Sequence, residues 1–301
     1  MSRPDAWVAP ALMTTMVVWG LNFPIVKTLT RWFDTEQLTT LRMVVACATY
    51  WVLMALQRQR LPAFTRRQWV GIVACAFTMV YLNQVFFISG LQRSSAANGA
   101  LIMATSPMVA AVLAALAFGE RLHARHLGAV VLGFGGVAVV VLNKPGAALG
   151  SAGLGDLLLV GCVIAFALGG VIVQRMAPRV DALHLNSIVY LLGSAMLLAQ
   201  LLVLQGDTLT TEQLFPGWWP WLLLVVSSVC ATALSNWVWT SAIARIGVAR
   251  TTVYVYWVPV FGMGFSALLL GEQLNAWYGL GLVMVWASSR LAQSGLGIAR
   301  G

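Results

Sequence analysis

Charged residues are scarce in this sequence, and their scarcity excludes a water-soluble fold. Only 9% of the 301 residues are Asp, Glu, Lys or Arg, whereas 60% are hydrophobic. An average soluble domain is about 25% charged and roughly 45–50% apolar. A chain with so few charges cannot cover its surface with groups that water solvates, so we expect a membrane protein.

Acidic residues and histidines are scarcer still, with nine Asp and Glu and three His in the whole chain. No Asp or Glu falls in the middle third of an apolar run, and the histidines are not grouped at metal-ligand spacing. The cysteines form no CxxC pair and lie inside apolar runs, where we interpret them as small packing residues: Cys47, Cys75, Cys162 and Cys230. We therefore expect no metal, no cofactor and no catalytic residue. A membrane-embedded enzyme, which generally needs reactive groups deep in the bilayer or long catalytic loops, is disfavoured.

Long apolar runs are what the sequence has in abundance. Most are long enough to cross ~30 Å of hydrocarbon as helices that rise about 1.5 Å per residue. Uniform runs favour helices over a membrane β-barrel, whose strands alternate between apolar and polar residues. The fold class is thus all-α, a polytopic membrane protein with ten predicted spans at 8–28, 36–56, 69–91, 97–118, 124–142, 153–175, 182–204, 219–242, 249–270 and 275–293.

The 18 Lys and Arg residues outnumber the nine acidic residues, which gives a net charge of +9. They lie mainly in the connections between apolar runs, so the excess indicates membrane topology and not a nucleic-acid partner. If the N-terminus is cytoplasmic, most of the arginines are cytoplasmic too, and only Lys27, Arg31, Arg93 and Lys144 lie outside. This positive-inside bias predicts a multi-pass protein of a bacterial-type inner membrane, with the N- and C-termini in the cytoplasm.

The two halves of the sequence share a repeated element. An offset of 152 positions pairs Pro107 with Pro259, and each of these prolines precedes a Gly-Glu pair by twelve residues. We therefore predict two five-helix repeats, at residues 1–148 and 149–301. Because five is an odd number, the second repeat enters the membrane with the opposite orientation. Inverted repeats of this kind are the usual scaffold for alternating access.

Three features of the sequence resemble EamA-type exporters of the drug/metabolite transporter superfamily. They are Trp19-Gly20-Leu21-Asn22-Phe23-Pro24 in the first helix, Leu41-Arg42 early in the second, and the proline-to-Gly-Glu element in the fourth and ninth. The resemblance covers about the whole chain. It implies a central cavity lined chiefly by helices one, three, four, six, eight and nine, and export of amino acids or other small metabolites. The Trp and Tyr residues of the inner helices favour a relative of the aromatic and neutral amino-acid exporters.

Polar and aromatic side chains at membrane depth are the candidates for substrate contact, because polar groups there usually face a cavity or another helix. They also serve as interhelical packing groups, so both interpretations stay open. Prolines inside helices leave backbone carbonyls unpaired, and we expect hinges or gates at Pro24, Pro107 and Pro259. The candidate substrate-binding residues are Trp19, Asn22, Phe23, Tyr81, Gln84, Asn98, Ser106, Asn236, Trp239, Tyr254 and Trp257.

Charged residues at or near the spans have structural explanations. Arg42 lies within the second span, where it either attracts a carboxylate from the external side or pairs with helix-end carbonyls, and we favour the structural role. Lys27 is near a helix end, from which its ammonium group reaches the membrane surface. Glu120 and Glu272 precede the fifth and tenth helices, where a carboxylate complements the positive helix end.

These observations predict a transporter that exports small metabolites, aromatic or neutral amino acids in particular, by alternating access. Because no acidic group lies in the middle of a span, we expect a facilitator or an exchanger and not a proton-driven carrier. The expected partners are a small-molecule substrate and the lipid bilayer, and the protein is expected to be a monomer or weak dimer. The alternatives are a permease for nucleotide-sugars or phosphorylated metabolites, which needs several cavity-facing Lys or Arg, and a drug permease. A channel would show rings of charge or repeated carbonyl filters.

Overall fold

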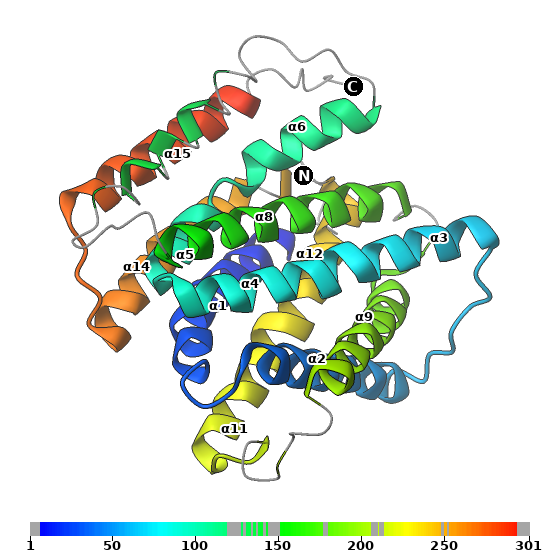
Figure 1. The fold of residues 1–301 in the computed structure, drawn as a ribbon. Helices are drawn as coiled ribbons and strands as arrows, with labels where there is room; N and C mark the ends of the chain where they lie inside the picture. Colours follow the sequence, from blue (N-terminus) through cyan, green and yellow to red (C-terminus); the bar gives the residue numbers. More distant parts are fainter. Residues whose placement is uncertain are drawn as a thin grey trace.

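The computed structural model is all-helical throughout the part of the chain that it describes (Figure 1). The described residues are 7–118, 128, 131–133, 135–136, 138–140, 143, 151–176, 180–205, 210, 214–247, 250–251 and 253–293. The fifth predicted span, 124–142, therefore lies largely outside the described residues. Each of the other predicted spans coincides with a helix or with a run of consecutive helices.

Six helical runs are long and apolar enough to cross a membrane. Four of them are single helices, namely α1 (Val8–Leu29), α2 (Thr35–Leu56), α8 (Ser151–Met176) and α9 (Ala182–Gln205). The other two, Arg66–Arg93 and Trp218–Ile246, each consist of three consecutive helical segments. Shorter apolar helices complete the bundle, so the chain is a polytopic all-α membrane protein, as the apolar runs predicted.

The two composite runs have the same internal arrangement. In the first, α3 (Arg66–Cys75) is followed by the π-helix η2 (Ala76–Leu82) and then by α4 (Asn83–Arg93). In the second, α11 (Trp218–Val226) is followed by the π-helix η3 (Ser227–Leu234) and then by α12 (Ser235–Ile246). The two π-helices begin at residues 76 and 227 and end at 82 and 234, so the offset is close to that of the proline motif. π-helical turns are rare and occur often at functional sites.

The fourth and ninth spans are also interrupted at corresponding places. Residues 104 and 105 form a turn between α5 (Ala96–Met103) and α6 (Ser106–Phe118). In the ninth span the 3₁₀-helix η4 (Val253–Tyr256) directly precedes α14 (Trp257–Leu270). The last described helix is α15 (Ala276–Gln293). Each interruption comes just before a proline, since Pro107 and Pro259 are the second and third residues of α6 and α14.

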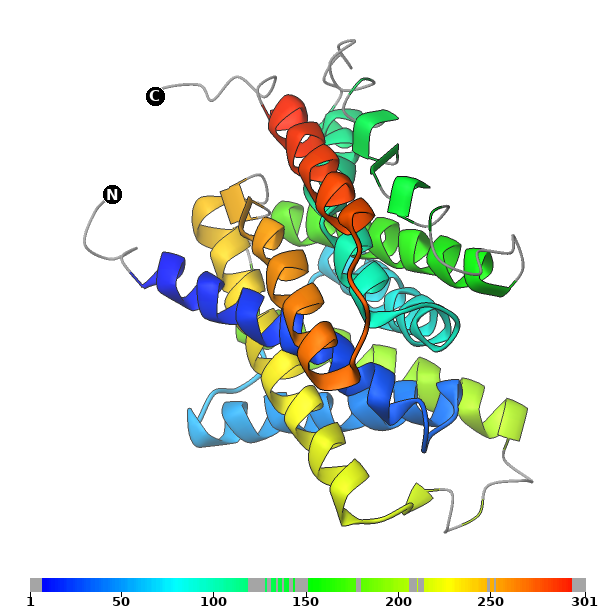
Figure 2. The same ribbon diagram turned by 90° about the vertical axis from the view of Figure 1, so that its left-hand side faces the viewer.

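Helices from one half of the sequence pack mainly on helices from the other half. α1 packs on α14, and its counterpart α8 packs on α5 and α6; α2 packs on α9, and α5 on α14. Figures 1 and 2 show α1 (blue) and the α11–η3–α12 run (yellow) crossing in the middle of the bundle. This exchange of corresponding partners is the packing expected of two related halves, whereas the exact boundary at residue 148 stays a prediction.

Small residues permit the closest of these contacts. A Cβ atom placed on Gly20 of α1 would lie 2.5 Å from Cβ of Phe261 in α14, and one placed on Gly262 would lie 2.4 Å from Cβ of Ala100 in α5. Both distances are too short for two carbon atoms that are not bonded. Glycine at these positions therefore lets the backbones of α1, α14 and α5 approach one another, as small residues do in membrane helix pairs.

Candidate functional site

A narrow cavity lies among the central helices and is lined by residues from both halves of the chain. Its walls come from α1, α2, η2, α4, α5, α8, α9, η3, α12 and α14. Arg42 is the one charged side chain among the described lining residues, and the others are amides, hydroxyls, sulfur-containing groups, aromatic rings and small apolar groups. The lining comprises Trp19, Asn22, Phe23, Arg42, Met79, Asn83, Gln84, Phe87, Met103, Cys162, Phe166, Tyr190, Ala231, Thr232, Asn236 and Val258.

The cavity is too small in this conformation to hold a metabolite. Its volume is about 60 Å³, whereas pockets that hold small-molecule ligands usually measure about 300–1,000 Å³. One water molecule takes up roughly 30 Å³ in the liquid. A solute larger than a few atoms therefore enters only if the surrounding helices move apart.

Arg42 is at the centre of the polar wall of this cavity, where only 1% of its surface is exposed. Its guanidinium donates three hydrogen bonds to neutral oxygens, from Nε to Ser227 Oγ (3.1 Å), from Nη1 to Gln84 Oε1 (2.9 Å) and from Nη2 to Thr232 Oγ1 (3.1 Å). It also lies 5.9 Å from the centre of the Phe87 ring, within the range of a cation–π contact. Arg42 thus connects α2 with α4 and with η3.

The hydrogen-bond network continues from Arg42 in two directions. On one side, Ser227 Oγ donates to Asn22 Oδ1 (2.6 Å), which ties η3 to α1. On the other side, Gln84 Nε2 donates to Asn83 Oδ1 (2.9 Å), and Asn83 Nδ2 donates to the Cys162 carbonyl (3.1 Å) of α8. The polar wall is therefore one connected network that joins five helices.

A cluster of three aromatic rings lies at the cavity. Trp19, Phe166 and Trp239 contact one another, with ring centroids 5.2 to 5.8 Å apart. Trp19 Nε1 donates to the Ala231 carbonyl (2.9 Å), but the buried Nε1 of Trp239 has no hydrogen-bond partner among the described residues. Buried polar groups normally have partners, and an orphaned donor costs about 1–3 kcal/mol. The indole N–H of Trp239 is therefore an unused donor next to two rings that line the cavity.

The structure places five predicted substrate-binding residues in the cavity lining: Trp19, Asn22, Phe23, Gln84 and Asn236. Trp239 lies directly behind this lining, in contact with Trp19 and Phe166. These residues come from α1, α4 and α12, which belong to the first, third and eighth spans, three of those that the family resemblance implied to line the cavity.

The other predicted substrate-binding residues lie outside the lining. Tyr81 stacks on the exposed ring of Phe77. The wide turns of η2 rotate Tyr81 away from the helical face of Gln84, which it would share in a regular α-helix. Ser106 donates its hydroxyl to the Met103 carbonyl. Trp257 is 42% exposed and does not line the cavity, although its neighbour Val258 does.

Two further predicted residues, Asn98 and Tyr254, are also absent from the lining. Tyr254 is half-buried in η4, and Asn98 belongs to a second buried polar cluster. Of the predicted hinges, Pro24 is buried inside α1 and Pro259 inside α14. Pro107 lies in the first turn of α6, where a proline is tolerated.

The second polar cluster holds the α4–α5 connection against the start of α8. Asp156 is 5% exposed, and its Oδ1 accepts hydrogen bonds from Ser94 Oγ and from Asn98 Nδ2 (3.0 Å). Tyr278 donates to Asn98 Oδ1 (2.9 Å), which brings α15 into the cluster. Sequence analysis did not single out Asp156, because a residue near a helix start looks solvent-exposed until its neighbours are known.

Two charged residues near this cluster bind backbone groups of helix ends. Glu272 accepts hydrogen bonds from the backbone N–H groups of Ala96 and Ala97 at 2.9 Å, so the positive helix end that it complements is that of α5 and not that of the tenth span. Lys27 Nζ donates to the carbonyls of Leu91, Gln92 and Ser94 at the end of α4. Its ammonium group thus binds backbone carbonyls at the end of another helix.

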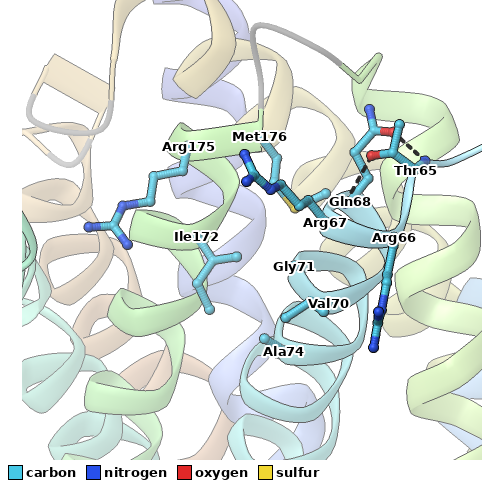
Figure 3. Close-up of a pocket in the computed structure, with 10 residues that line it drawn as sticks. All are labelled: Thr65, Arg66, Arg67, Gln68, Val70, Gly71, Ala74, Ile172, Arg175 and Met176. Carbon is cyan, nitrogen blue, oxygen red and sulfur yellow. Dashed lines mark hydrogen bonds between the residues drawn. The ribbon is translucent and has the colours of Figure 1, made fainter.

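A larger groove of about 1,060 Å³ lies at the charged ends of α3 and α8 (Figure 3). Its walls are mainly apolar, and Arg66, Arg67 and Arg175 lie around it. These residues come from the ends of their helices, whereas the central cavity is formed at mid-helix by ten elements. Size alone does not identify the site, and we assign it to the central cavity because polar groups converge there.

Sequence reasoning missed the central part of the site. For Arg42 a structural role was favoured over attraction of a carboxylate, and Asn83 and Thr232 were not among the predicted substrate-binding residues, yet all three line the cavity. Ser227 bonds both Arg42 and Asn22, although it was not singled out. The spacing of Thr232 and Asn236, four residues apart, was the signal in the sequence, but contacts between distant helices cannot be deduced from spacing.

Comparisons with known proteins agree with this architecture. Residues 6–142 and 153–292 each match the sequence model of the EamA-like transporter family. The chain is 24% identical over 295 residues to a probable amino-acid metabolite efflux pump of Escherichia coli. The alignment covers 95% of this chain and 93% of that protein. It is 21% identical over 277 residues to the uncharacterized transporter YetK of Bacillus subtilis, and this alignment covers 91% of this chain and 83% of the relative.

A solved structure titled "Crystal structure of protein" has the same fold. It superposes with a TM-score of 0.69 at 17% sequence identity, over 95% of this chain and 96% of that one. At this identity the likeness concerns the fold alone.

Proposed function

The chain belongs to the EamA-like transporter family, and we propose that it exports small metabolites, aromatic or neutral amino acids in particular, by alternating access through the central cavity. The observation that carries this proposal is the lining of the cavity, which combines amide groups and aromatic rings from helices of both halves. Amides bind ammonium and carboxylate groups, and the rings contact an apolar side chain. The name of the Escherichia coli relative supports the same class of solute.

The transport cycle that we propose requires the cavity to open alternately to the two sides of an inner membrane, with both termini in the cytoplasm. The interruptions before Pro107 and Pro259 and the two π-helices are the places where the helices bend most easily. Widening the cavity from its present volume of about 60 Å³ admits the solute. Repacking α1 against α14 and α8 against α5 would then change the side that is open.

We further propose that transport follows the solute gradient, as in a facilitator or an exchanger. Among the described residues that line the cavity there is no Asp or Glu. A proton-driven carrier needs a group there that binds and releases protons. Transport in vesicles without an imposed gradient is then expected to be insensitive to pH, and a strict requirement for a pH gradient would refute this mechanism.

Counterflow in proteoliposomes tests the proposed function. Vesicles loaded with one amino acid take up the labelled form of another only if both use the same carrier. A panel of aromatic and neutral amino acids, nucleotide-sugars and phosphorylated metabolites distinguishes the solute classes, and we expect exchange for the amino acids. Exchange confined to the phosphorylated compounds would refute the proposal.

Variants of one cavity residue and one surface residue connect the activity to the cavity. Asn22→Ala is expected to lower counterflow about tenfold or more, since it removes a lining amide. Trp219→Ala, at a residue that is 48% exposed, should leave counterflow nearly unchanged. Equal effects of the two substitutions would show that the solute path lies elsewhere.

A further inference from the structure

We propose that Arg42 binds a carboxylate group of the solute, so that the cavity selects solutes by this group. The inference rests on the proposed transport function and specifies the chemical class of solute that the cavity accepts. It differs from a purely structural role for Arg42, in which the three hydrogen bonds to protein oxygens are its whole contribution. Three features of the cavity support it: the uncompensated charge of Arg42, the unused N–H groups of its guanidinium, and the presence of a single cation in the described lining.

The charge of Arg42 is not compensated by the protein. Its side chain is 99% buried, and its three hydrogen-bond acceptors are a serine, a glutamine and a threonine. No carboxylate lies within ion-pair distance of Arg42 in the part of the chain that the structure describes. Burial of a charge without a partner costs several kcal/mol. A negatively charged group that enters the cavity therefore interacts strongly with this guanidinium.

The guanidinium also has hydrogen-bonding capacity to spare. Arginine carries five N–H donors, and the three hydrogen bonds to Ser227, Gln84 and Thr232 use one donor from each nitrogen. One N–H of Nη1 and one of Nη2 thus remain for another acceptor. With one donor left on each Nη atom, the guanidinium can still bind the oxygens of a carboxylate.

A single cation favours a carboxylate over a phosphate. A phosphate monoester carries a charge of nearly −2 and three acceptor oxygens, and it is usually bound by several basic groups. Arg42 is the only Lys or Arg among the described lining residues. The rings of Trp19 and Phe166, which also line the cavity, suit an apolar side chain on the same solute.

The neighbouring Gln84 makes a sharp test possible. Gln84 Oε1 accepts a hydrogen bond from Arg42 Nη1 at 2.9 Å, so Gln84→Glu places a carboxylate beside the guanidinium with almost no change in shape. Gln84 itself lines the cavity, so the readout is the ratio of the affinity for an acid to that for its amide; if Arg42 is purely structural, Gln84→Glu changes both affinities alike and leaves this ratio unchanged. If Arg42 binds the solute, the new carboxylate competes with it, and the apparent affinity for a carboxylate solute falls roughly tenfold to a hundredfold.

The matched control is Gln57→Glu, which adds the same charge at an exposed residue just after α2. It is expected to have no effect on the apparent affinity. Arg42→Lys keeps the charge but not the paired donors, and it should lower the affinity for the acid more than that for its amide.

The probes are L-phenylalanine and phenylacetate, each compared with its carboxamide. Counterflow measures their transport, and the shift of the thermal unfolding temperature of the purified protein measures their binding. The comparison of acid and amide in the unaltered protein needs no variant, so it remains informative even if Gln84→Glu fails to fold. We expect both acids to bind at least tenfold more tightly than their amides.

The outcomes separate this inference from the proposed function. Transport of L-phenylalanine with equal affinity for its amide, and without an effect of Gln84→Glu, would overturn the role of Arg42 but leave amino-acid export intact. Binding of phenylacetate that Gln84→Glu abolishes, without counterflow of any amino acid, would support Arg42 and refute amino-acid export. Binding of neither acid at millimolar concentration would overturn the inference.

Discussion

Arg42 and Trp239 are two buried residues at the site that have hydrogen-bonding capacity to spare. Arg42 retains two N–H groups, and Trp239 Nε1 has no partner. Such groups normally destabilise a folded protein, and they are common where a ligand supplies the missing partner. Arg42 lines the cavity, and Trp239 lies directly behind the lining, against Trp19 and Phe166.

Replacing Trp239 with Phe tests the orphaned N–H. Trp239→Phe keeps an aromatic ring beside Trp19 and Phe166 but removes a donor that has no acceptor. We expect a change in unfolding free energy of about 1 kcal/mol or less, because no hydrogen bond is lost. If the N–H binds the solute, the apparent affinity in counterflow falls about fivefold to tenfold.

Trp19→Phe is the matched control for this substitution. Trp19 Nε1 donates to the Ala231 carbonyl, so its loss leaves a buried acceptor unpaired and should lower the unfolding temperature. A Trp239→Phe variant that is less stable than Trp19→Phe but transports normally would contradict our interpretation of Trp239.

At the scale of the helices, the described spans differ from simple apolar rods in ways that determine where side chains point. Each π-helix adds residues to a turn, which rotates everything that follows it relative to a regular α-helix. This is why Gln84 faces the cavity and Tyr81 does not. The same effect brings Ser227 and Thr232, five residues apart in η3, to one guanidinium.

The close packing of α14 predicts an effect of adding one methyl group. Gly262→Ala would place Cβ 2.4 Å from Cβ of Ala100 and force α14 away from α5, so we expect a loss of about 1–3 kcal/mol in unfolding free energy. Gly264→Ala is the matched control on the same helix, because nothing lies within 4 Å of its added Cβ. Thermal unfolding in detergent should show Gly262→Ala to be less stable and Gly264→Ala to be unchanged or slightly more stable.

Glu272 is expected to hold the start of α5 in place. Its two oxygens accept from the backbone N–H groups of Ala96 and Ala97, so Glu272→Ala leaves both donors unpaired. We expect a loss of about 1–2 kcal/mol in unfolding free energy, with a smaller loss for Glu272→Gln, which keeps one acceptor oxygen. Identical stability of all three proteins in thermal unfolding would contradict this assignment.

At the scale of the whole molecule, the distribution of charge predicts how the chain lies in the membrane. Most arginines fall on one side of the predicted topology, which we take to be the cytoplasm. In a cysteine-free background, Gln59→Cys is expected to react with a membrane-impermeant maleimide only in inverted vesicles. Arg31→Cys is its matched partner and should react only in right-side-out vesicles; labelling of both residues from one side would contradict the topology.

Sequence and structure agree most closely on what each helix determines by itself. A helix in lipid satisfies its own backbone groups, so its span can be recognised from a continuous apolar run without knowledge of its neighbours. The spans that became α1, α2, α8 and α9 were predicted to within two residues at each end. The family also follows from local motifs, since the Trp19–Pro24 segment and the proline element each lie within a short stretch of the sequence.

The tertiary structure alone decided which polar groups form the site. The sequence indicated that Asn22, Gln84 and Asn236 could face a cavity, and they do, but it offered the same argument for Asn98, which binds Asp156 in another cluster. The partners of Arg42 lie 42, 185 and 190 positions away along the chain. The rotation and packing of separate helices bring these residues together, and no local pattern encodes them, because spacing within a helix specifies only which residues share a face.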